Sequence, residues 1–449
     1  MKFTKVRGLK GSLSVPGDKS ISHRAIMLGA LAEGTTYISH FLQGADCLST
    51  ISCFSKMGIS ITNNPKTEEV KIIGKGLYGL KKPREILDAG NSGTTTRLLS
   101  GILSGQQFSS LLTGDASIQK RPMHRIITPL HQMEASIESL SGNGCAPLKI
   151  GNDRVEQKSL KGITYISPIA SAQVKSCVLL AGLYADHKTG VIEPALSRNH
   201  TELMLSAFGA KVETKDIESF VFPHPKLSAI EIAVPGDISS AAYFIAAAAL
   251  LPHSEVLLLG VGINPSRDGI LQVARQMGLD FSLENIRYQG KEAVADILVK
   301  SSHLKATTIE GSLIPTLIDE IPIIALMAAC ADGTTHIKDA AELKVKESNR
   351  LDIMVSELSK MGVSIEASED GMIIHGDSSK PLKGACIDSH LDHRIAMTFA
   401  IAGLIAEGET EILHPECVTI SYPDFYKDLS SLIDGNVVFL NANGSLPAR

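Results

Sequence analysis

Several features that mark whole classes of protein are missing from this sequence. No run reaches the ~18 apolar residues of a membrane helix, no GxxxxGK[ST] phosphate loop is present, and there are no low-complexity tracts or blocks of like charge. The seven cysteines are an odd number without CxxC spacing, which indicates reduced, mostly packed thiols. The first residues lack the apolar segment of a signal peptide. These absences predict a cytoplasmic globular protein without a membrane partner.

The charge balance narrows the range of partners. The formal net charge is −5, so the chain lacks the general basic surface that a nucleic acid requires. A local basic pocket for small anions is compatible with this balance. With 449 residues, of which 44% are hydrophobic, the chain is too long for a single core, and we expect two domains.

One short pattern recurs six times along the chain. It consists of a helix end, a small residue and a short strand, as in "FSKMGISI" and "SKMGVSI", at a spacing of roughly 70–85 residues. Glycine suits the hinge because a helix commonly ends on a left-handed residue, which costs glycine nothing. The second copy has glutamate there and is the weakest match. The hinge residues are Gly58, Glu134, Gly209, Gly278, Gly362 and Gly435.

A second pattern alternates with the first and predicts interior helices. Each copy is a nearly all-apolar helix followed by a short turn and a β-prone stretch. A helix that is apolar on all sides is buried on all sides. We therefore expect each repeat to contain one interior and one amphipathic helix, with three repeats in each of two lobes. The copies contain "HRAIMLGAL", "TTRLLSGIL", "AQVKSCVLLAG", "AAYFIAAAALL", "IPIIALMAAC" and "HRIAMTFAIAG".

The tetrapeptide VPGD occurs twice, at residues 15–18 and 234–237. Proline followed by glycine makes a sharp, fixed turn that suits a hinge. We expect the chain to cross between lobes at these turns. One lobe then comprises residues 17–235 and the other residues 1–16 plus 236–449, with the segment before Gly17 adding a strand to the second lobe. The alternative is a common turn that recurs by chance.

Polar residues gather where the apolar helices begin and on two loops. Helix N-termini offer free N–H groups and partial positive charge, and arginine grips carboxylate and phosphate oxygens in pairs. Taken singly, each serine or aspartate is more simply a helix cap, but the repetition favours an anion site. His390 and His393, without a third ligand, do not indicate a metal. The cations are Lys19, Arg24, Arg121, Lys346, Arg350 and Arg394.

Taken together, these segments resemble a known family. The motifs "GDKSISHR", "NSGTTTR", "GDASIQKRPM", "SAQVK", "SRNHTE", "NPSR", "KVKESNR" and "LDHR" are similar to those of 3-phosphoshikimate 1-carboxyvinyltransferases (EPSP synthases), over residues 10 to about 430. "RNHTE" and "SAQVK" look closest to the class II branch. The resemblance implies an α/β (α+β) fold, a two-lobed inside-out α/β barrel of the EPT/RTPC-like type, in which each lobe has three βαβαββ repeats.

The resemblance also assigns residues to the two substrates, position by position. Residues around shikimate 3-phosphate are Lys19, Ser20, Arg24, Ser171, Ala172 through its backbone, and Gln173, with Ser197 and Arg198 beside them. Those around phosphoenolpyruvate are Gly93, Arg121, Arg350 and Arg394, and Lys19 and Gln173 touch both substrates. Asp319 and Lys346 match contacts to the shikimate ring.

The implied reaction transfers the enolpyruvyl group to the 5-hydroxyl of shikimate 3-phosphate, in the shikimate pathway. Asp319 is the expected base for that hydroxyl. Glu347 is the expected proton donor and acceptor at C3 of phosphoenolpyruvate, with Lys19 close by. The arginines polarise the enol ether and hold the leaving phosphate, and lobe closure excludes water. We expect no metal or organic cofactor, and a monomer.

Departures from the family pattern carry their own expectations. Some relatives have lysine just before the "YPDF"-like segment, where this chain has Ile420 and Ser421. One cation is then missing or comes from elsewhere. Gly93 is present where the herbicide-insensitive class II form has alanine, so we expect glyphosate to have room beside it. The tail from about Asn441 reads as a disordered end.

Two other functions compete with this one. The sister enzyme that places enolpyruvate on UDP-N-acetylglucosamine has the same fold but carries a reactive cysteine in the loop that here reads "GDASIQKR". A non-enzymatic scaffold for a protein partner predicts an apolar groove, not one rich in lysine and arginine. Both alternatives are weaker than the EPSP synthase reading.

Overall fold

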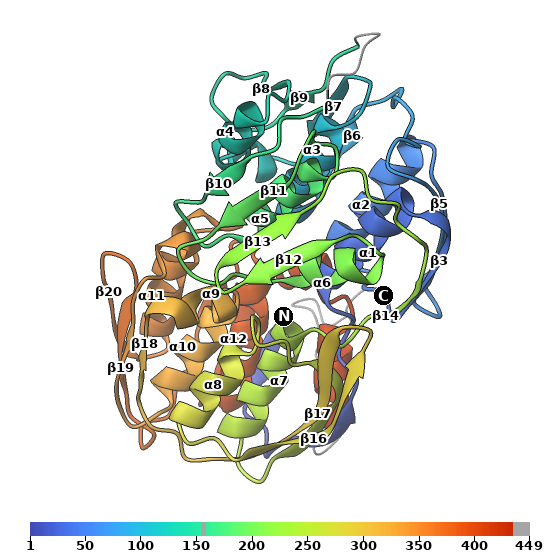
Figure 1. The fold of residues 1–449 in the computed structure, drawn as a ribbon. Helices are drawn as coiled ribbons and strands as arrows, with labels where there is room; N and C mark the ends of the chain where they lie inside the picture. The colour runs from blue at the N-terminus through green and yellow to red at the C-terminus, as the bar shows by residue number, and fades with distance from the viewer. Residues whose placement is uncertain (154–158, 434–449) are drawn as a thin grey trace. The chain divides into compact units, whose positions relative to one another are not determined.

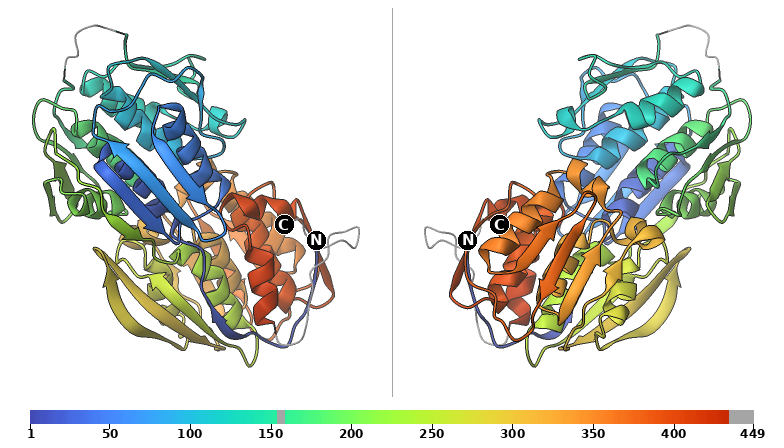
Figure 2. Two further views of the ribbon diagram at one scale, coloured as in Figure 1. Left: turned by 90° about the vertical axis from the view of Figure 1, so that its right-hand side faces the viewer. Right: turned by 90° about the vertical axis from the view of Figure 1, so that its left-hand side faces the viewer.

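The structure is a computed structural model that describes residues 1–153 and 159–433 (Figure 1). Gly435 and the tail from Asn441 lie outside the described residues. The chain forms two compact units. Unit 1 comprises Met1–Pro16, Pro235–Tyr288 and the chain from Ala293 onward, and unit 2 comprises Gly17–Val234 with Gln289–Glu292. Within each unit, the sheets lie on the outside of a group of helices (Figures 1 and 2).

Unit 2 contains three four-stranded sheets of one topology. In each sheet a parallel pair is extended by two antiparallel strands. The first sheet has the spatial order β14 (Glu231–Ala233), β3 (Glu33–Ser39), β5 (Glu69–Lys75) and β4 (Ser60–Asn64). The second has the order β6 (Leu87–Asp88), β7 (Ser110–Thr113), β9 (Leu148–Ile150) and β8 (Ile137–Ser139). The third has the order β10 (Thr164–Ile166), β11 (Thr189–Ile192), β13 (Glu218–Val221) and β12 (Val212–Lys215). The predicted βαβαββ unit is thus confirmed.

Unit 1 repeats this topology, and its described third sheet has three strands. The first sheet has the order β2 (Lys10–Leu13), β15 (Glu255–Gly262), β17 (Glu292–Lys300) and β16 (Phe281–Gln289). The second has the order β18 (Thr308–Ile309), β19 (Gly333–Ile337), β21 (Met372–Gly376) and β20 (Ser364–Ala367). The third has the order β22 (Cys386–Asp388), β23 (Glu409–Leu413) and β1 (Lys2–Thr4). β2 pairs in parallel with β15, with Lys10 opposite Glu255. The segment before Gly17 therefore supplies the expected strand, and also a second strand, β1, that the sequence did not predict.

The six apolar segments form the interior helices of the two units. Almost every residue beyond the first turn of these helices is buried, as the all-apolar patterns predicted. α3 packs against α5 and α1, whereas α7, α10 and α12 pack against one another. The interior helices are α1 (Lys19–Leu31), α3 (Gly93–Ser104), α5 (Ala172–Gly182), α7 (Ile238–Leu250), α10 (Ile321–Ala329) and α12 (His393–Ile405).

Further helices follow the middle strand of each repeat and cover its sheet. They are α2 (Ala45–Lys56), α4 (His124–Gln132), α6 (His200–Ala207), α8 (Gly269–Gln276), α11 (Arg350–Lys360) and α13 (Phe425–Leu432), with a single extra turn at α9 (Ile314–Leu317). Four 3-10 turns lie at Ile118–Lys120, Gly311–Leu313, Ala341–Val345 and Pro415–Ile420. Among the described helices, none is by itself long and apolar enough to span a membrane.

The hinges after α2, α4, α6, α8 and α11 adopt the left-handed conformation that the glycine pattern predicted. The φ angles are +84° at Gly58, +96° at Gly209, +81° at Gly278 and +86° at Gly362. Glu134, the weakest match in sequence, has φ +61° and therefore occupies the same conformation. The backbone requirement is common to the described repeats, and a side chain meets it in one of them at an energetic cost.

Replacing Glu134 by glycine should relieve this cost. Glu134 is exposed, so we expect Glu134→Gly to raise the free energy of unfolding by roughly 0.5–1 kcal/mol. Gly209→Glu is the matched reverse substitution in the same unit, since a Cβ there meets only the Lys226 carbonyl at 3.8 Å. It should lower the stability by about 1–2 kcal/mol. Urea unfolding measures both changes, and a shift in the same direction for both variants contradicts the explanation.

Candidate active site

Polar residues cap the interior helices, as the simpler reading of the motifs proposed. Within the described chain, side-chain oxygens accept hydrogen bonds from first-turn N–H groups at five of the six helices. The exception, α10, follows Glu320, which makes no side-chain cap bond. Capping satisfies one donor of each helix and leaves other first-turn N–H groups available to a ligand. The capping residues are Asp18, Ser92, Ser171, Asp237 and Asp392.

In unit 2 the N-terminal parts of the three interior helices are joined by side chains. The Gln173 amide on α5 donates to Thr94 Oγ1 on α3 at 3.1 Å. Arg24 Nη2 on α1 donates to Ser176 Oγ on α5 at 2.8 Å. The N-terminal ends of α1, α3 and α5 therefore meet at one end of this unit, where their partial positive charges reinforce one another.

Gly93 begins α3 in the middle of this convergence. A Cβ at Gly93 would lie 3.2 Å from Arg121 Nη1, 3.3 Å from Arg97 Nη1 and 3.9 Å from Gln173 Nε2. The structure thus brings the predicted residues Gly93, Arg121 and Gln173 together, with Arg121 held by Asn91 at 3.0 Å and Ser117 at 3.1 Å.

Arg97 is a further cation that the sequence analysis missed. It lies one turn after Gly93 on α3 and donates a hydrogen bond to the Gln173 side chain. Its spacing of four residues from Gly93 was a usable signal, because residues i and i+4 share a helix face.

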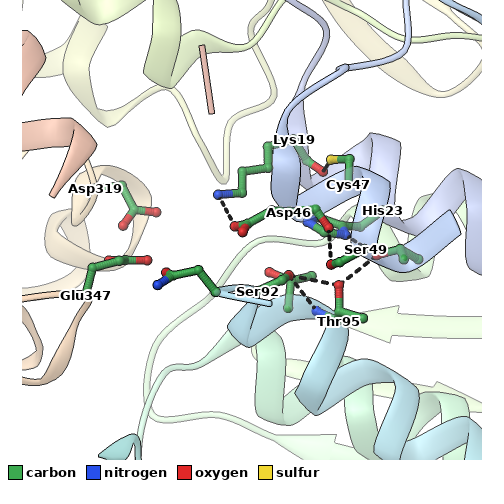
Figure 3. A network of polar contacts seen from close by, with 12 residues as sticks. Lys19, His23, Asp46, Cys47, Ser49, Ser92, Thr95, Asp319 and Glu347 are labelled. Atoms are coloured by element: carbon green, nitrogen blue, oxygen red, sulfur yellow. Dashed lines mark hydrogen bonds and ion pairs between the residues drawn. The ribbon is translucent and has the colours of Figure 1, made fainter. Parts of the chain in front are cut away.

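Lys19 opens α1 and pairs with a carboxylate of the neighbouring helix α2. Its Nζ lies 2.5 Å from Asp46 Oδ2, and its side chain is 18% exposed. Figure 3 shows Lys19 reaching toward Asp46 from the start of its helix. The pair holds the ammonium group in place and keeps it partly open to solvent. No sequence pattern pointed to Asp46 as its partner.

Arg24 is far more enclosed than the sequence suggested. Its Nε donates to Thr201 Oγ1 at 2.6 Å and its Nη1 to the Ser20 carbonyl at 2.9 Å, in addition to the Ser176 contact. Burial lowers the pKa of Arg24 to about 10, against the opposing effect of the Glu202 carboxylate. In this structure Arg24 ties α1 to α5 and α6, and its direct contact with substrate stays a prediction.

The remaining predicted residues of unit 2 flank α5. Ser171 caps this helix with a 3.5 Å bond from Val174 N, and Ala172 is its first residue. The carbonyl of Ser197, which precedes Arg198, accepts a 3.2 Å bond from Lys175. Lys175 is fully buried between the carboxylates of Glu193 and Glu202, both at 2.8 Å, which fixes the segment that carries Ser197 and Arg198.

In unit 1, three predicted cations surround Asp319. Lys346 Nζ and Arg350 Nη1 each lie 3.4 Å from Asp319 Oδ1, and Arg394 Nη2 lies 3.9 Å from Oδ2. Glu347 accepts a 2.5 Å bond from Arg350 Nη2. Five residues predicted from separate motifs therefore form one group of two carboxylates and three cations.

Asp392, the cap of α12, binds Arg350 of this group. Arg350 Nε donates to Asp392 Oδ2 at 2.8 Å. Burial acts to raise the pKa of Asp392, but the Arg350 guanidinium outweighs it and holds that pKa below its ordinary value. Burial likewise acts to lower the pKa of Arg350, yet Asp392 and Glu347 raise it overall, so this arginine stays charged. The motif "LDHR" contains Asp392, but its helical partner could not be read from the sequence.

The interior helices of unit 1 also converge at their first turns. Arg267 Nη2 donates to Ser239 Oγ on α7 at 2.6 Å and lies 3.7 Å from Glu320, which precedes α10. Burial acts to lower the pKa of Arg394 on α12, but Asp319 and Tyr243 raise it overall. Positive helix ends and permanent cations thus occupy one region of this unit as well.

The remaining sequence expectations concern the cation that is missing at Ile420 and the absence of a metal site. Ile420 packs against the core of unit 1, so this position supplies no cation. No group of three or more His, Cys, Asp or Glu side chains suited to a metal occurs in the described parts of the chain. The groups that do gather offer N–H donors and cations for anionic ligands, and two carboxylates for proton transfer.

Comparison with known proteins agrees with this chemistry. The family model for "EPSP synthase (3-phosphoshikimate 1-carboxyvinyltransferase)" matches residues 3–429. The 3-phosphoshikimate 1-carboxyvinyltransferase of Thermoanaerobacter sp. (strain X514) is 58% identical over 432 residues, which cover 96% of this chain and 100% of that protein. That of Desulforamulus reducens is 52% identical over 428 residues, or 95% of this chain and 98% of the relative.

Solved structures show the same likeness. An EPSP synthase from Acinetobacter baumannii superposes with a TM-score of 0.85 at 46% identity, covering 96% of this chain and 98% of that one. The enolpyruvyl transferase NikO from Streptomyces tendae has a TM-score of 0.77 at 15% identity, over 96% and 97% of the two chains, and shares the fold. The predicted two-lobed inside-out α/β fold is confirmed, and the chain belongs to the EPSP synthase (3-phosphoshikimate 1-carboxyvinyltransferase) family.

Proposed function

We propose that this chain transfers the enolpyruvyl group of phosphoenolpyruvate to the 5-hydroxyl of shikimate 3-phosphate and releases phosphate. The observation that carries the proposal is the group around Asp319, in which two carboxylates lie among three cations. The cations suit two anionic substrates, and the carboxylates suit a reaction that moves two protons. UDP-N-acetylglucosamine, the competing acceptor, is not favoured by the family match.

The substrates are assigned to residues of both units. Lys19, Ser20, Arg24, Ser171, Ala172 and Gln173 are proposed to bind shikimate 3-phosphate, with Ser197 and Arg198 adjacent, and Asp319 and Lys346 to contact its ring. Gly93, Arg121, Arg350 and Arg394 are proposed to bind phosphoenolpyruvate, together with Lys19 and Gln173. Within each unit the assigned residues lie beside helix N-termini that converge, and this supports the binding of anionic substrates there.

Proton transfer is assigned to Asp319 and Glu347. Asp319 takes the proton of the 5-hydroxyl as its oxygen attacks C2 of phosphoenolpyruvate, while Glu347 gives a proton to C3. In the second step Glu347 removes a proton from C3, the C2–O bond to phosphate breaks, and Asp319 returns its proton to the leaving phosphate. Both carboxylates end as they began. Arg350 holds Glu347 before substrate binds, and a bound anion that competes for Arg350 frees Glu347 to carry a proton.

The two units are proposed to be lobes that move about the VPGD turns. The unit boundaries fall at Pro16–Gly17 and Val234–Pro235. Gly17 is required for a close approach, since a Cβ there would lie 1.9 Å from the His40 carbonyl oxygen. All the assigned residues belong to one chain, which suits a monomer. None of the seven cysteines, all of which lie in the described ranges, is joined in a disulfide, and this suits the cytoplasm.

The acceptor is tested by phosphate release from phosphoenolpyruvate. With shikimate 3-phosphate, we expect phosphate and enolpyruvyl ether in equal amounts. With UDP-N-acetylglucosamine, we expect no phosphate above background. Release with the nucleotide sugar alone overturns the proposal in favour of the sister enzyme, and release with neither acceptor overturns both.

Asp319→Asn should separate catalysis from binding. The substitution removes the proposed base, so we expect kcat to fall by about 10²–10⁴-fold. It also leaves Lys346, Arg350 and Arg394 without that carboxylate, so the KM for phosphoenolpyruvate should not rise. Asp280→Asn makes the same charge change at an exposed site in unit 1 and should leave both constants unchanged. An unchanged kcat in Asp319→Asn removes Asp319 from its role.

Glyphosate should compete with phosphoenolpyruvate. The atoms that a Cβ at Gly93 would meet are the ends of two arginine side chains, so Gly93→Ala should fold normally while narrowing the space. We expect weaker glyphosate inhibition in Gly93→Ala than in the parent, measured as the inhibition constant against phosphoenolpyruvate. Inhibition that is independent of phosphoenolpyruvate concentration contradicts this placement.

A further inference from the structure

A chain of buried hydrogen bonds runs from α1 through α2 to the start of α3. His23 Nδ1 lies 2.7 Å from Thr50 Oγ1, and Thr50 Oγ1 lies 2.7 Å from Thr95 Oγ1. Thr95 Oγ1 donates to Ser92 Oγ at 2.8 Å, and Ser92 Oγ also accepts the Thr95 backbone N–H at 3.0 Å. All four residues are fully buried. Figure 3 shows the chain ending at the cap of α3.

The direction of the hydrogen bonds fixes the tautomer of His23. Each hydroxyl has one proton to donate. Thr95 gives its proton to Ser92, so Thr50 must donate to Thr95. Thr50 then has no proton left for His23, and His23 Nδ1 must be the donor. The imidazole therefore carries its proton on Nδ1 and an unprotonated nitrogen at Nε2.

Two independent features agree with a neutral ring in this form. Nε2 is buried and has no hydrogen-bond partner among the described residues, which suits a bare nitrogen better than a charged N–H. Burial lowers the pKa of His23 well below its ordinary value, and the charges of Lys19 and Arg24 lower it further. The donor at Nδ1 is consequently permanent near neutral pH.

The hydrogen-bond chain ends beside Gly93, in the region proposed to bind phosphoenolpyruvate. Ser92 directly precedes Gly93, and the turn that it caps carries Thr94 and leads into Arg97, both bound to Gln173. A shift of this turn moves the first N–H groups of α3 and the cation Arg97 together. Displacements of about 1 Å in such groups can cost as much as 10²-fold in rate.

We infer that His23 is a positioning residue that acts through Thr50, Thr95 and Ser92 to fix the first turn of α3 for phosphoenolpyruvate. The inference rests on the proposed function. It assigns His23 no contact with either substrate. According to this inference, the neutral Nδ1–H donor of His23 sets the geometry of the first turn of α3, and the charge and volume of the ring do not.

The first test reads the tautomer directly. ¹⁵N NMR of histidine-labelled wild-type protein should show a protonated Nδ1 and a bare Nε2 for His23, assigned by comparison with His23→Asn. Free imidazole side chains ordinarily favour the opposite tautomer, so the result is not expected by default. A proton on Nε2, or a charged ring at neutral pH, overturns the inference whatever the activity of the protein.

The second test breaks the chain at its middle with little change in volume. Thr50→Val should raise the KM for phosphoenolpyruvate about tenfold, while the KM for shikimate 3-phosphate stays within about twofold. Thr50→Ser keeps the hydroxyl and should restore the wild-type value. Thr36→Val is the matched control, because Thr36 is equally buried in the same unit and its hydroxyl has no hydrogen-bond partner among the described residues.

His23 variants complete the comparison. Asparagine places an amide N–H close to the position of Nδ1, so His23→Asn should retain most of the phosphoenolpyruvate affinity, whereas His23→Leu should lose it to the same degree as Thr50→Val. A merely structural chain would lower the melting temperature of Thr50→Val and leave its KM unchanged, and that outcome overturns the inference. If the wild-type protein shows no transferase activity, the proposed function fails instead, and the NMR result still decides the hydrogen-bond chain.

Discussion

The complete burial of six apolar helices is the constraint on which the rest of this structure depends. A helix without a polar face can meet solvent or ligands only at its ends, and its first turn leaves N–H groups unpaired. In unit 2 side chains tie the N-terminal parts of α1, α3 and α5 to one another, and in unit 1 the first turns of α7, α10 and α12 lie beside buried cations. The packing itself thus gathers helix N-termini, which suit anionic ligands, at one end of each unit.

Ion pairs offset the free-energy cost of placing these cations away from water. Buried cations are costly unless carboxylates lie beside them. Asp46 forms an ion pair with Lys19, Asp392 forms one with Arg350, and Asp319 lies among three cations. Asp319 thus stabilises the folded state, and it is also the carboxylate proposed to act as the base. In the proposed reaction, incoming anions replace part of this pairing, which links substrate binding to the protonation of Asp319 and Glu347.

The sequence predicted the repeats because their physics is local. All-apolar helices, left-handed hinges such as Gly58 and even Glu134, and the strand before Gly17 follow from periodicity and turn chemistry. Side-chain contacts between different elements could not be predicted, because they depend on tertiary packing. Arg97, Asp46 and Asp392 were therefore missed as partners of the predicted residues, and the bonds from Arg24 to α5 and α6 were not foreseen. Family resemblance, not periodicity, supplied the assignment of each residue to a substrate.

The central claim is that anionic substrates bind at the first turns of the interior helices. Hydrogen exchange of backbone amides, measured with and without shikimate 3-phosphate and phosphoenolpyruvate, tests it most directly. The account predicts slower exchange in the opening turns of α1, α3, α5, α10 and α12, with no change at the starts of α4 and α8. Slowing confined to the starts of α4 and α8, or unchanged exchange at the interior helices in the presence of saturating substrates, would contradict it.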